Sequence, residues 1–230
     1  MAGTVHEGHR GRMRKRFLAT GFAGFPEHEM LEMLLYYCIP RRDTNEIARA
    51  LIEKYGSLHA VLCADAAELQ QFPDISENAA VYLTMFRAVY QYDVQNQMTG
   101  AVLDDFRKCC DFFAELYQYD TREIVRIALL DEKLRVIRCE TVSEGHPSAA
   151  QITVHRITEL AYSAGSNTVI LAHNHPRGTA SISPEDIAVT RHLVPILRQC
   201  AVSLADHIVV GENEAVSMRE YGVYLGLEMD

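Results

Sequence analysis

The sequence predicts an α+β fold in which a helical N-terminal region precedes a region that contains strands. From residue 26, apolar residues recur at the three- and four-residue spacing of amphipathic helices. From residue 123, short runs rich in β-branched residues indicate strands. The polar residues 93–102 lie between these regions and predict a linker. We therefore expect a helical domain over residues 1–100 and a second domain over residues 101–230.

The composition is that of a globular protein, with 48% hydrophobic residues in a chain of 230. No apolar run is long enough to span a bilayer, so no membrane partner is expected. The polar N-terminus lacks the apolar core of a signal peptide. The six cysteines form no regular framework, which favours reduced thiols and a cytoplasmic location. The net charge of −9 argues against a generally basic nucleic-acid binder.

The elements of the first region are bounded by proline, glycine and serine. Pro26 suits a first helical turn, Gly56 a C-cap and Ser76 an N-cap. The predicted helices cover residues 26–37 and 43–56, begin again at residues 57 and 64, and end with a longer helix over about residues 77–92.

A basic segment precedes these helices and has two interpretations. Its charges could neutralise DNA phosphates, or they could pair with Glu27, Glu29 and Glu32 at the surface of a helix. The basic residues of this segment are Arg10, Arg12, Arg14, Lys15 and Arg16.

The second region alternates helices and strands. A hairpin turn at residues 131–133 joins its first two strands, and Pro195 is expected to kink or break its last helix. The predicted helices are 104–116, 157–164 and 184–199, and the predicted strands are 123–130, 134–142, 168–172, 202–204, 207–210 and 215–218.

The most informative stretch runs from the strand that ends near residue 172 into the last helix. His173 and His175 are two residues apart, so in an extended chain both imidazoles face one point. Ser183 suits the N-cap of the following helix, and Asp186 falls in its first turn. Two imidazoles and one carboxylate predict a catalytic site for one zinc ion, with one position open for water. The alternatives are a polar strand end and a capping box between Ser183 and Asp186.

These residues resemble the JAB/MPN metalloprotease family and, more closely, its RadC-like branch of DNA repair proteins. The matching segments are His173–Pro176, Gly178, Ser183–Asp186 and Asp206–Gly211. The resemblance extends from about Gly8 to near the C-terminus. It implies a mixed, cytidine-deaminase-like sheet flanked by helices, behind a module similar to a helix-hairpin-helix.

The resemblance also implies roles for individual residues. Glu123 stands where the family has an upstream glutamate that holds the attacking water and moves its proton. Glu140 and Glu144 are rival candidates in the same region. Ser183 would donate a hydrogen bond to the oxyanion. In the family, Asp206 and His207 lie near the edge of the site, and a packing or hydrogen-bonding role is the alternative for both.

Two positions depart from the family pattern. The hairpin normally carries Gly-x-Gly, and this chain has Asp74–Ser76 there, which places a carboxylate where a DNA phosphate would approach. Arg156 occupies a position where the RadC-like branch usually has glutamate. That glutamate either supports the site or only caps a helix, and both interpretations stand.

Three functions follow as expectations. The first is a zinc-dependent metallopeptidase that cleaves a peptide or isopeptide substrate. The second is a DNA-associated repair accessory protein in which zinc is structural or vestigial. The third is another zinc chemistry, although the chain lacks the Cys-x-x-Cys pair of a deaminase and shows few ligands for the second metal of a phosphodiesterase.

Overall fold

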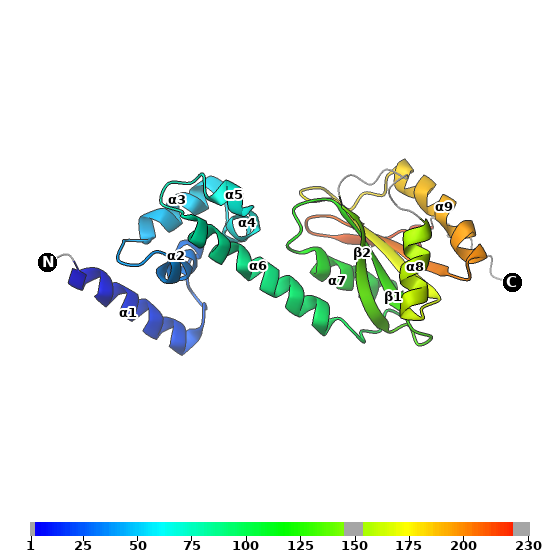
Figure 1. Ribbon diagram of the computed structural model, residues 1–230, viewed down its shortest axis with the longest axis horizontal. Coiled ribbons are helices and arrows are strands. Elements are labelled where there is room, and N and C mark those ends of the chain that lie inside the picture. Colours follow the sequence, from blue (N-terminus) through cyan, green and yellow to red (C-terminus); the bar gives the residue numbers. More distant parts are fainter. Residues whose placement is uncertain (1–2, 145–153, 223–230) are drawn as a thin grey trace. The chain divides into compact units, whose positions relative to one another are not determined.

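The computed structural model describes residues 3–144 and 154–222 (Figure 1). The chain forms two compact units that meet between Tyr90 and Gln91, inside helix α6 (Glu77–Gln97). The predicted linker is therefore helical in its first half. The side-chain amide of Gln97 donates to Asp93 over 2.7 Å within this helix, and no glycine interrupts it before Gly100, whose φ is +87°.

The N-terminal unit is helical, as the sequence predicts. Its core is formed by leucines that are fully buried, including Leu31, Leu35, Leu51 and Leu83. The helices of this unit that precede α6 are α1 (Gly3–Thr20), α2 (Glu27–Cys38), α3 (Asn45–Tyr55), α4 (Leu58–Cys63) and α5 (Ala66–Leu69).

The turn before α6 keeps a left-handed conformation without a glycine. Asp74 has a φ of +70°, a region that aspartate tolerates better than most residues. Its carboxylate accepts from Arg42 over 2.6 Å, and the Ser76 hydroxyl accepts from the N–H of Ala79, as expected of an N-cap. The carboxylate at this turn is thus neutralised by a partner from the same unit.

The C-terminal unit contains a five-stranded mixed sheet in the order β2-β1-β3-β4-β5. Among the described strands, only β3 and β4 are parallel, and the other neighbours are antiparallel. With the helical N-terminal unit, this sheet confirms the predicted α+β class. The elements of this unit are α7 (Phe106–Tyr117), β1 (Ile124–Leu130), β2 (Val136–Glu144), α8 (Val154–Ala164), β3 (Thr168–Asn174), α9 (Pro184–Gln199), β4 (Ser203–Val210) and β5 (Ala215–Ser217).

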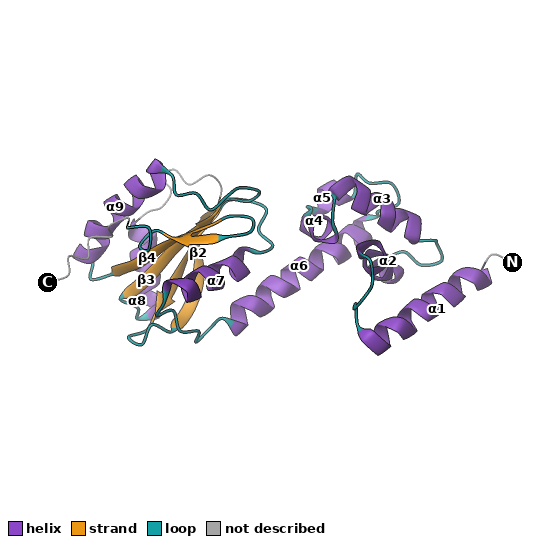
Figure 2. Ribbon diagram, turned by 180° about the vertical axis from the view of Figure 1, so that it is seen from behind, coloured by secondary structure: helices purple, strands orange, loops and turns teal. Residues whose placement is uncertain are grey.

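Helices cover both faces of this sheet (Figures 1 and 2). Alternate residues of the central strands, such as Ile127 and Leu171, pack with Ile157 of α8 and Leu193 of α9. Helix α7 lies against the other face, where the Tyr117 hydroxyl contacts the carbonyl oxygen of Ala172 at 2.9 Å. The side chains at the carboxyl end of β3 that point toward α9 are therefore those on the same face of the strand as Leu171, spaced two residues apart.

Two expected interruptions are absent from the described residues. Of the kink or break expected at Pro195, the break is wrong, because helix α9 continues through Pro195 as one helix, although proline supplies no N–H to the helical ladder there. Leu193, Val194 and Leu197 around it are buried in the core, which holds the helix together. Strand β4 is also continuous, with a register shift against β3 in place of a gap. None of the described helices is long and apolar enough to cross a membrane.

Candidate metal centre

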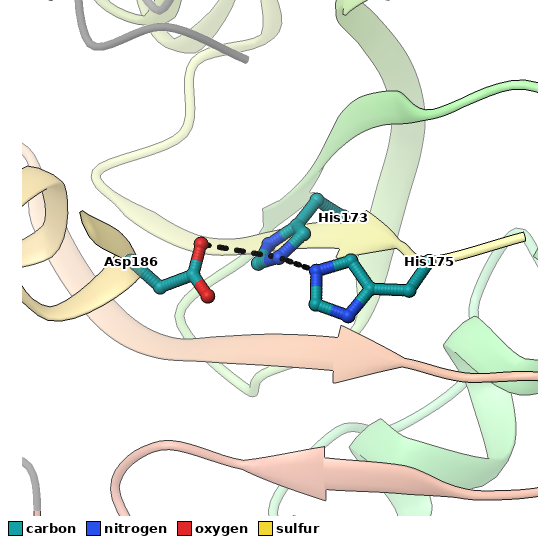
Figure 3. Close-up of side chains that lie close together, drawn as sticks. All are labelled: His173, His175 and Asp186. Atoms are coloured by element: carbon teal, nitrogen blue, oxygen red, sulfur yellow. Dashed lines mark hydrogen bonds and ion pairs between the residues drawn. The ribbon is translucent and has the colours of Figure 1, made fainter. Parts of the chain in front are cut away.

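Three polar side chains converge where β3 ends and α9 begins (Figure 3). His173 comes from the strand, His175 from the residue after its end, and Asp186 from the first turn of α9. The Nε2 atom of His173 lies 3.1 Å from Nε2 of His175 and 3.2 Å from Oδ1 of Asp186. One ligand atom from each residue lies within 4.8 Å of the others, so this group could hold a metal ion.

Hydrogen bonds orient the side chains of His175 and Asp186 from the side opposite the candidate site. Nδ1 of His175 lies 3.0 Å from the carbonyl oxygen of Thr179, which only accepts, so in the neutral imidazole Nδ1 carries the proton and Nε2 has the lone pair. Oδ2 of Asp186 accepts from both the N–H and the hydroxyl of Ser183, at 2.8 and 2.7 Å. The remaining oxygen, Oδ1, faces His173.

The third ligand candidate, His173, is buried against a second histidine. Its Nδ1 lies 2.9 Å from Nε2 of His207, and the two side chains belong to neighbouring strands. Burial lowers the pKa of His173 to about 4, with Asp186 acting in the opposite direction and His175 lowering it further. Burial also holds the pKa of His207 well below its usual value. Both imidazoles are therefore neutral at physiological pH, the state that binds metal.

Ser183 forms the capping box that the sequence offered as an alternative. Its hydroxyl donates to Oδ2 of Asp186 and accepts from the N–H of Asp186 at 3.1 Å. The capping box and the convergence on the histidines coexist, because they use different oxygens of one carboxylate. The oxyanion role of Ser183 stays a prediction, and it requires the hydroxyl proton to turn away from Asp186.

Glu123 lies directly before β1, beside the carboxyl end of β3. Val125 pairs with His173 across the two strands, and the Asn174 side chain bonds the residues on either side of Glu123. Its amide oxygen accepts from the N–H of Ile124 over 2.7 Å, and its amide nitrogen donates to the carbonyl oxygen of Arg122 over 3.0 Å. Asn174 thus fixes the backbone of Glu123 relative to the His-x-His pair.

The rival glutamates on β2 lie at different heights of the sheet. Glu140 pairs with Ile127 in the middle of β1 and forms an ion pair with Arg138 at 3.3 Å. Glu144 pairs with Ile124, so it lies at the same end of the sheet as Glu123. Glu140 is the least suited of the three by position.

The loop that carries His175 is held by a close backbone contact with Gly211. A Cβ atom at Gly211 would lie 2.4 Å from the N atom of Ala180 and 2.7 Å from the carbonyl carbon of Thr179. The N–H of His175 also donates to Val210 over 2.7 Å. Only glycine allows this approach, and the approach places the Thr179 carbonyl that orients His175.

Several contributors to the site have weak sequence signals. Asn174 lies between the two histidines and could have been noticed by its position alone. Thr190 lies four residues after Asp186, one turn along α9, and its hydroxyl is 2.6 Å from Nδ1 of His207. Asp206 points elsewhere, because its carboxylate accepts from the hydroxyl of Ser217.

The basic segment and Arg156 have partners within the protein. Arg16 forms an ion pair with Glu29 at 2.9 Å, and Arg10 donates to carbonyl oxygens at the end of α2, including that of Ile39. Arg156 pairs with Glu159 of its own helix at 3.0 Å. Part of the basic charge is thus used inside the helical unit, while DNA contact by the exposed residues Arg12, Arg14 and Lys15 stays a prediction.

The fold and the site together define a JAB-type domain, with a mixed sheet between helices and a His-x-His and aspartate group at the carboxyl end of β3. Comparison with protein families agrees, since residues 103–223 match the family model described as the RadC-like JAB domain. That match covers more than half of the chain, and the protein therefore belongs to the RadC-like JAB family. The resemblance seen in the sequence is confirmed.

Proposed function

We propose that this protein is a zinc-dependent hydrolase that cleaves the amide bond of a peptide or isopeptide. One observation carries the proposal: three potential ligand atoms of His173, His175 and Asp186 face one another while other groups hold the opposite sides of these side chains. Acceptor atoms at such short distances repel one another unless a proton or a cation lies between them. A metal ion satisfies all three at once.

The donor set favours zinc over harder cations. Two imidazole nitrogens and one carboxylate oxygen are a ligand set of catalytic zinc, which leaves a fourth position for water or substrate. Magnesium and calcium prefer oxygen ligands throughout. Bound zinc supplies a Lewis acid that makes water acidic enough to be deprotonated near neutral pH.

The protein's own groups would then move the proton and stabilise charge. Glu123 would take the proton from the attacking water and deliver it to the leaving amine, a role that suits a carboxylate near the site. Its backbone position between two Asn174 hydrogen bonds supports this assignment. Ser183 would donate a hydrogen bond to the oxyanion once its hydroxyl group turns away from Asp186.

The first test is zinc content, measured by elemental analysis after zinc supplementation. We expect near-stoichiometric zinc in the wild type and in Glu123→Gln, and loss of zinc in His173→Ala. His192→Ala serves as the control, because His192 is an exposed histidine of α9 and its removal should leave the zinc content unchanged. Cleavage of a peptide and isopeptide panel should be lost in both His173→Ala and Glu123→Gln.

Two results would overturn the proposal. A wild-type protein without zinc after supplementation would exclude zinc hydrolysis and leave the His-x-His group as a relic. A zinc-loaded wild type with no cleavage of any member of the panel, together with salt-sensitive binding to duplex DNA, would favour the DNA-associated accessory function instead.

A further inference from the structure

A second histidine lies behind the candidate metal ligand His173, and a threonine lies behind that histidine. His207 Nε2 is 2.9 Å from His173 Nδ1, and His207 Nδ1 is 2.6 Å from the Thr190 hydroxyl. His207 is 2% exposed and Thr190 is 0% exposed. Since both side chains are sealed from solvent, they must satisfy each other.

These contacts form a hydrogen-bond chain from Thr190 through His207 to His173, and such a hydrogen-bond chain has a direction. A neutral imidazole has one N–H donor and one lone-pair acceptor, so each histidine that accepts on one nitrogen donates from the other. If His207 accepts from His173, then His207 must donate to Thr190. If instead His207 accepts from Thr190, it donates to His173, and the proton of His173 then resides on Nε2. Only the first direction leaves Nε2 of His173 free to bind a metal.

Thr190 selects between the two directions. Its hydroxyl lies 2.7 Å from the main-chain carbonyl oxygen of Asp186, one turn earlier in α9, and donates to it. The hydroxyl has a single proton, so its lone pairs remain for the N–H of His207. Met218 offers only a weak sulfur acceptor, 3.7 Å away.

We propose that Thr190 and His207 are positioning residues that fix His173 in the tautomer whose Nε2 binds the metal. The inference rests on the proposed metal site and specifies how that site is set for binding. The hydrogen-bond chain begins at the main-chain carbonyl oxygen of Asp186, and the side-chain carboxylate of the same residue is a candidate metal ligand. Helix α9 therefore supplies both a metal ligand and the group that orders another ligand through β4.

The two ligand histidines differ in how their tautomers are fixed. His175 faces the carbonyl oxygen of Thr179, which has no proton to give, so one contact determines its tautomer. His173 faces an imidazole, which offers either a proton or a lone pair. The tautomer of His173 is thus decided by the Thr190 hydroxyl, which reaches His173 through two successive hydrogen bonds with His207 between them.

The test compares Thr190→Val with Thr190→Ser. Valine keeps the shape of threonine without the hydroxyl, so the N–H of His207 loses its acceptor and the chain reverses. We expect the zinc affinity of Thr190→Val, measured by competition with a chelator, to fall by about 10- to 100-fold. Thr190→Ser keeps the hydroxyl and should bind zinc close to the wild-type affinity. Nitrogen NMR of zinc-loaded wild type should show the His207 proton on Nδ1.

The outcomes separate this inference from the proposed function. A wild type that binds no zinc refutes the metal site itself. A wild type that binds zinc, with equal affinity in Thr190→Val, refutes only the positioning role, as would a His207 proton on Nε2. If Thr190→Val fails to fold, His207→Gln and His207→Met replace it. The glutamine oxygen can accept from His173, so His207→Gln should bind zinc more tightly than His207→Met; equal affinities would refute the role.

Discussion

Each unit of the protein places a carboxylate beside a histidine, and the two clusters differ in what surrounds the carboxylate. In the helical unit, Glu32 is 1% exposed, and its oxygens accept from Tyr36 and Asn45, each over 2.7 Å. His9 lies 3.0 Å from the same carboxylate. Burial, together with the hydrogen bond to Glu32, raises the pKa of Tyr36, so its hydroxyl stays a donor. This carboxylate is satisfied by donors.

In the sheet unit, the donors that the described residues supply to Asp186 reach one of its oxygens, Oδ2. Ser183 supplies both of them, and the other oxygen faces His173 at 3.2 Å. The nearby His175 also turns a lone pair toward the same point. Composition alone does not distinguish the clusters, because each combines a carboxylate, histidine and hydroxyl. What distinguishes a candidate metal centre is a set of acceptors that converge without donors.

The largest effect is expected at Gly211, where the backbone beside the sheet-unit cluster packs most closely. Gly211→Ala would place a methyl group against the backbone of Ala180 and Thr179, which forces the His175 loop to move. We expect a loss of stability on the order of 3 kcal/mol and a loss of zinc binding, measured by chemical denaturation and zinc titration. Gly11→Ala is the control, because an added Cβ there meets nothing within 4 Å. Retained stability and zinc affinity in Gly211→Ala would contradict the close packing.

The comparison of the two clusters is tested most directly by one chemical change made in both. Glu32→Gln turns an acceptor into a donor that faces Asn45 or Tyr36, and we expect a loss of about 1–3 kcal/mol in the free energy of unfolding. Asp186→Asn can keep its oxygen on Ser183 and donate its amide toward His173. We expect it to abolish zinc binding with no loss of metal-free stability.

Denaturation of the metal-free proteins and zinc titration of both variants give the readout. Glu32→Gln should leave the zinc affinity unchanged. An Asp186→Asn protein that is destabilised as strongly as Glu32→Gln would show that the sheet-unit cluster is an ordinary satisfied network.

The buried histidines predict a dependence of metal-free stability on pH. The folded-state pKa values of His173 and His207 lie below the usual 6.5, so the unfolded chain binds protons that the folded protein does not. The stability that depends on these histidines is therefore fully present above about pH 7 and is lost as the pH falls below the unfolded-state pKa of about 6.5. His207→Gln should reduce the slope of this loss, as measured by chemical denaturation over roughly pH 4.5 to pH 7. The exposed His192→Gln should not, and an unchanged slope in His207→Gln would contradict the prediction.

The smallest effect is expected at the turn before α6 in the helical unit. Asp74→Gly removes the exposed ion pair with Arg42 and relieves the left-handed backbone at φ +70°, so stability should change by less than about 1 kcal/mol. Loss of the carboxylate should strengthen duplex-DNA binding, measured by anisotropy at low and moderate salt. Asp74→Asn separates charge from backbone, since asparagine also tolerates this conformation. Weaker DNA binding in both variants would exclude this turn as a phosphate contact.

Local sequence patterns were sufficient for most of the elements and for the convergence of the three candidate ligands, although helix α1 was not among the predicted helices. Apolar spacing, caps and the alternation of strands located the helices and strands, because these depend on neighbours in the chain. The helix before the predicted linker extends further than expected, because the polar residues 93–97 are compatible with a helix and the first glycine after them is Gly100. Pro195 failed as a break because the core packing of α9 outweighs one missing hydrogen bond.

The sequence by itself determined that His173, His175 and Asp186 share one site, because strand alternation and a helix start fix them within a short segment. The tertiary structure alone decided what lies behind them. The parallel pairing of β3 with β4 brings His207 against His173, although 34 positions separate the two residues. No local spacing encodes such a contact, since it depends on strand order and on how α9 packs across both strands.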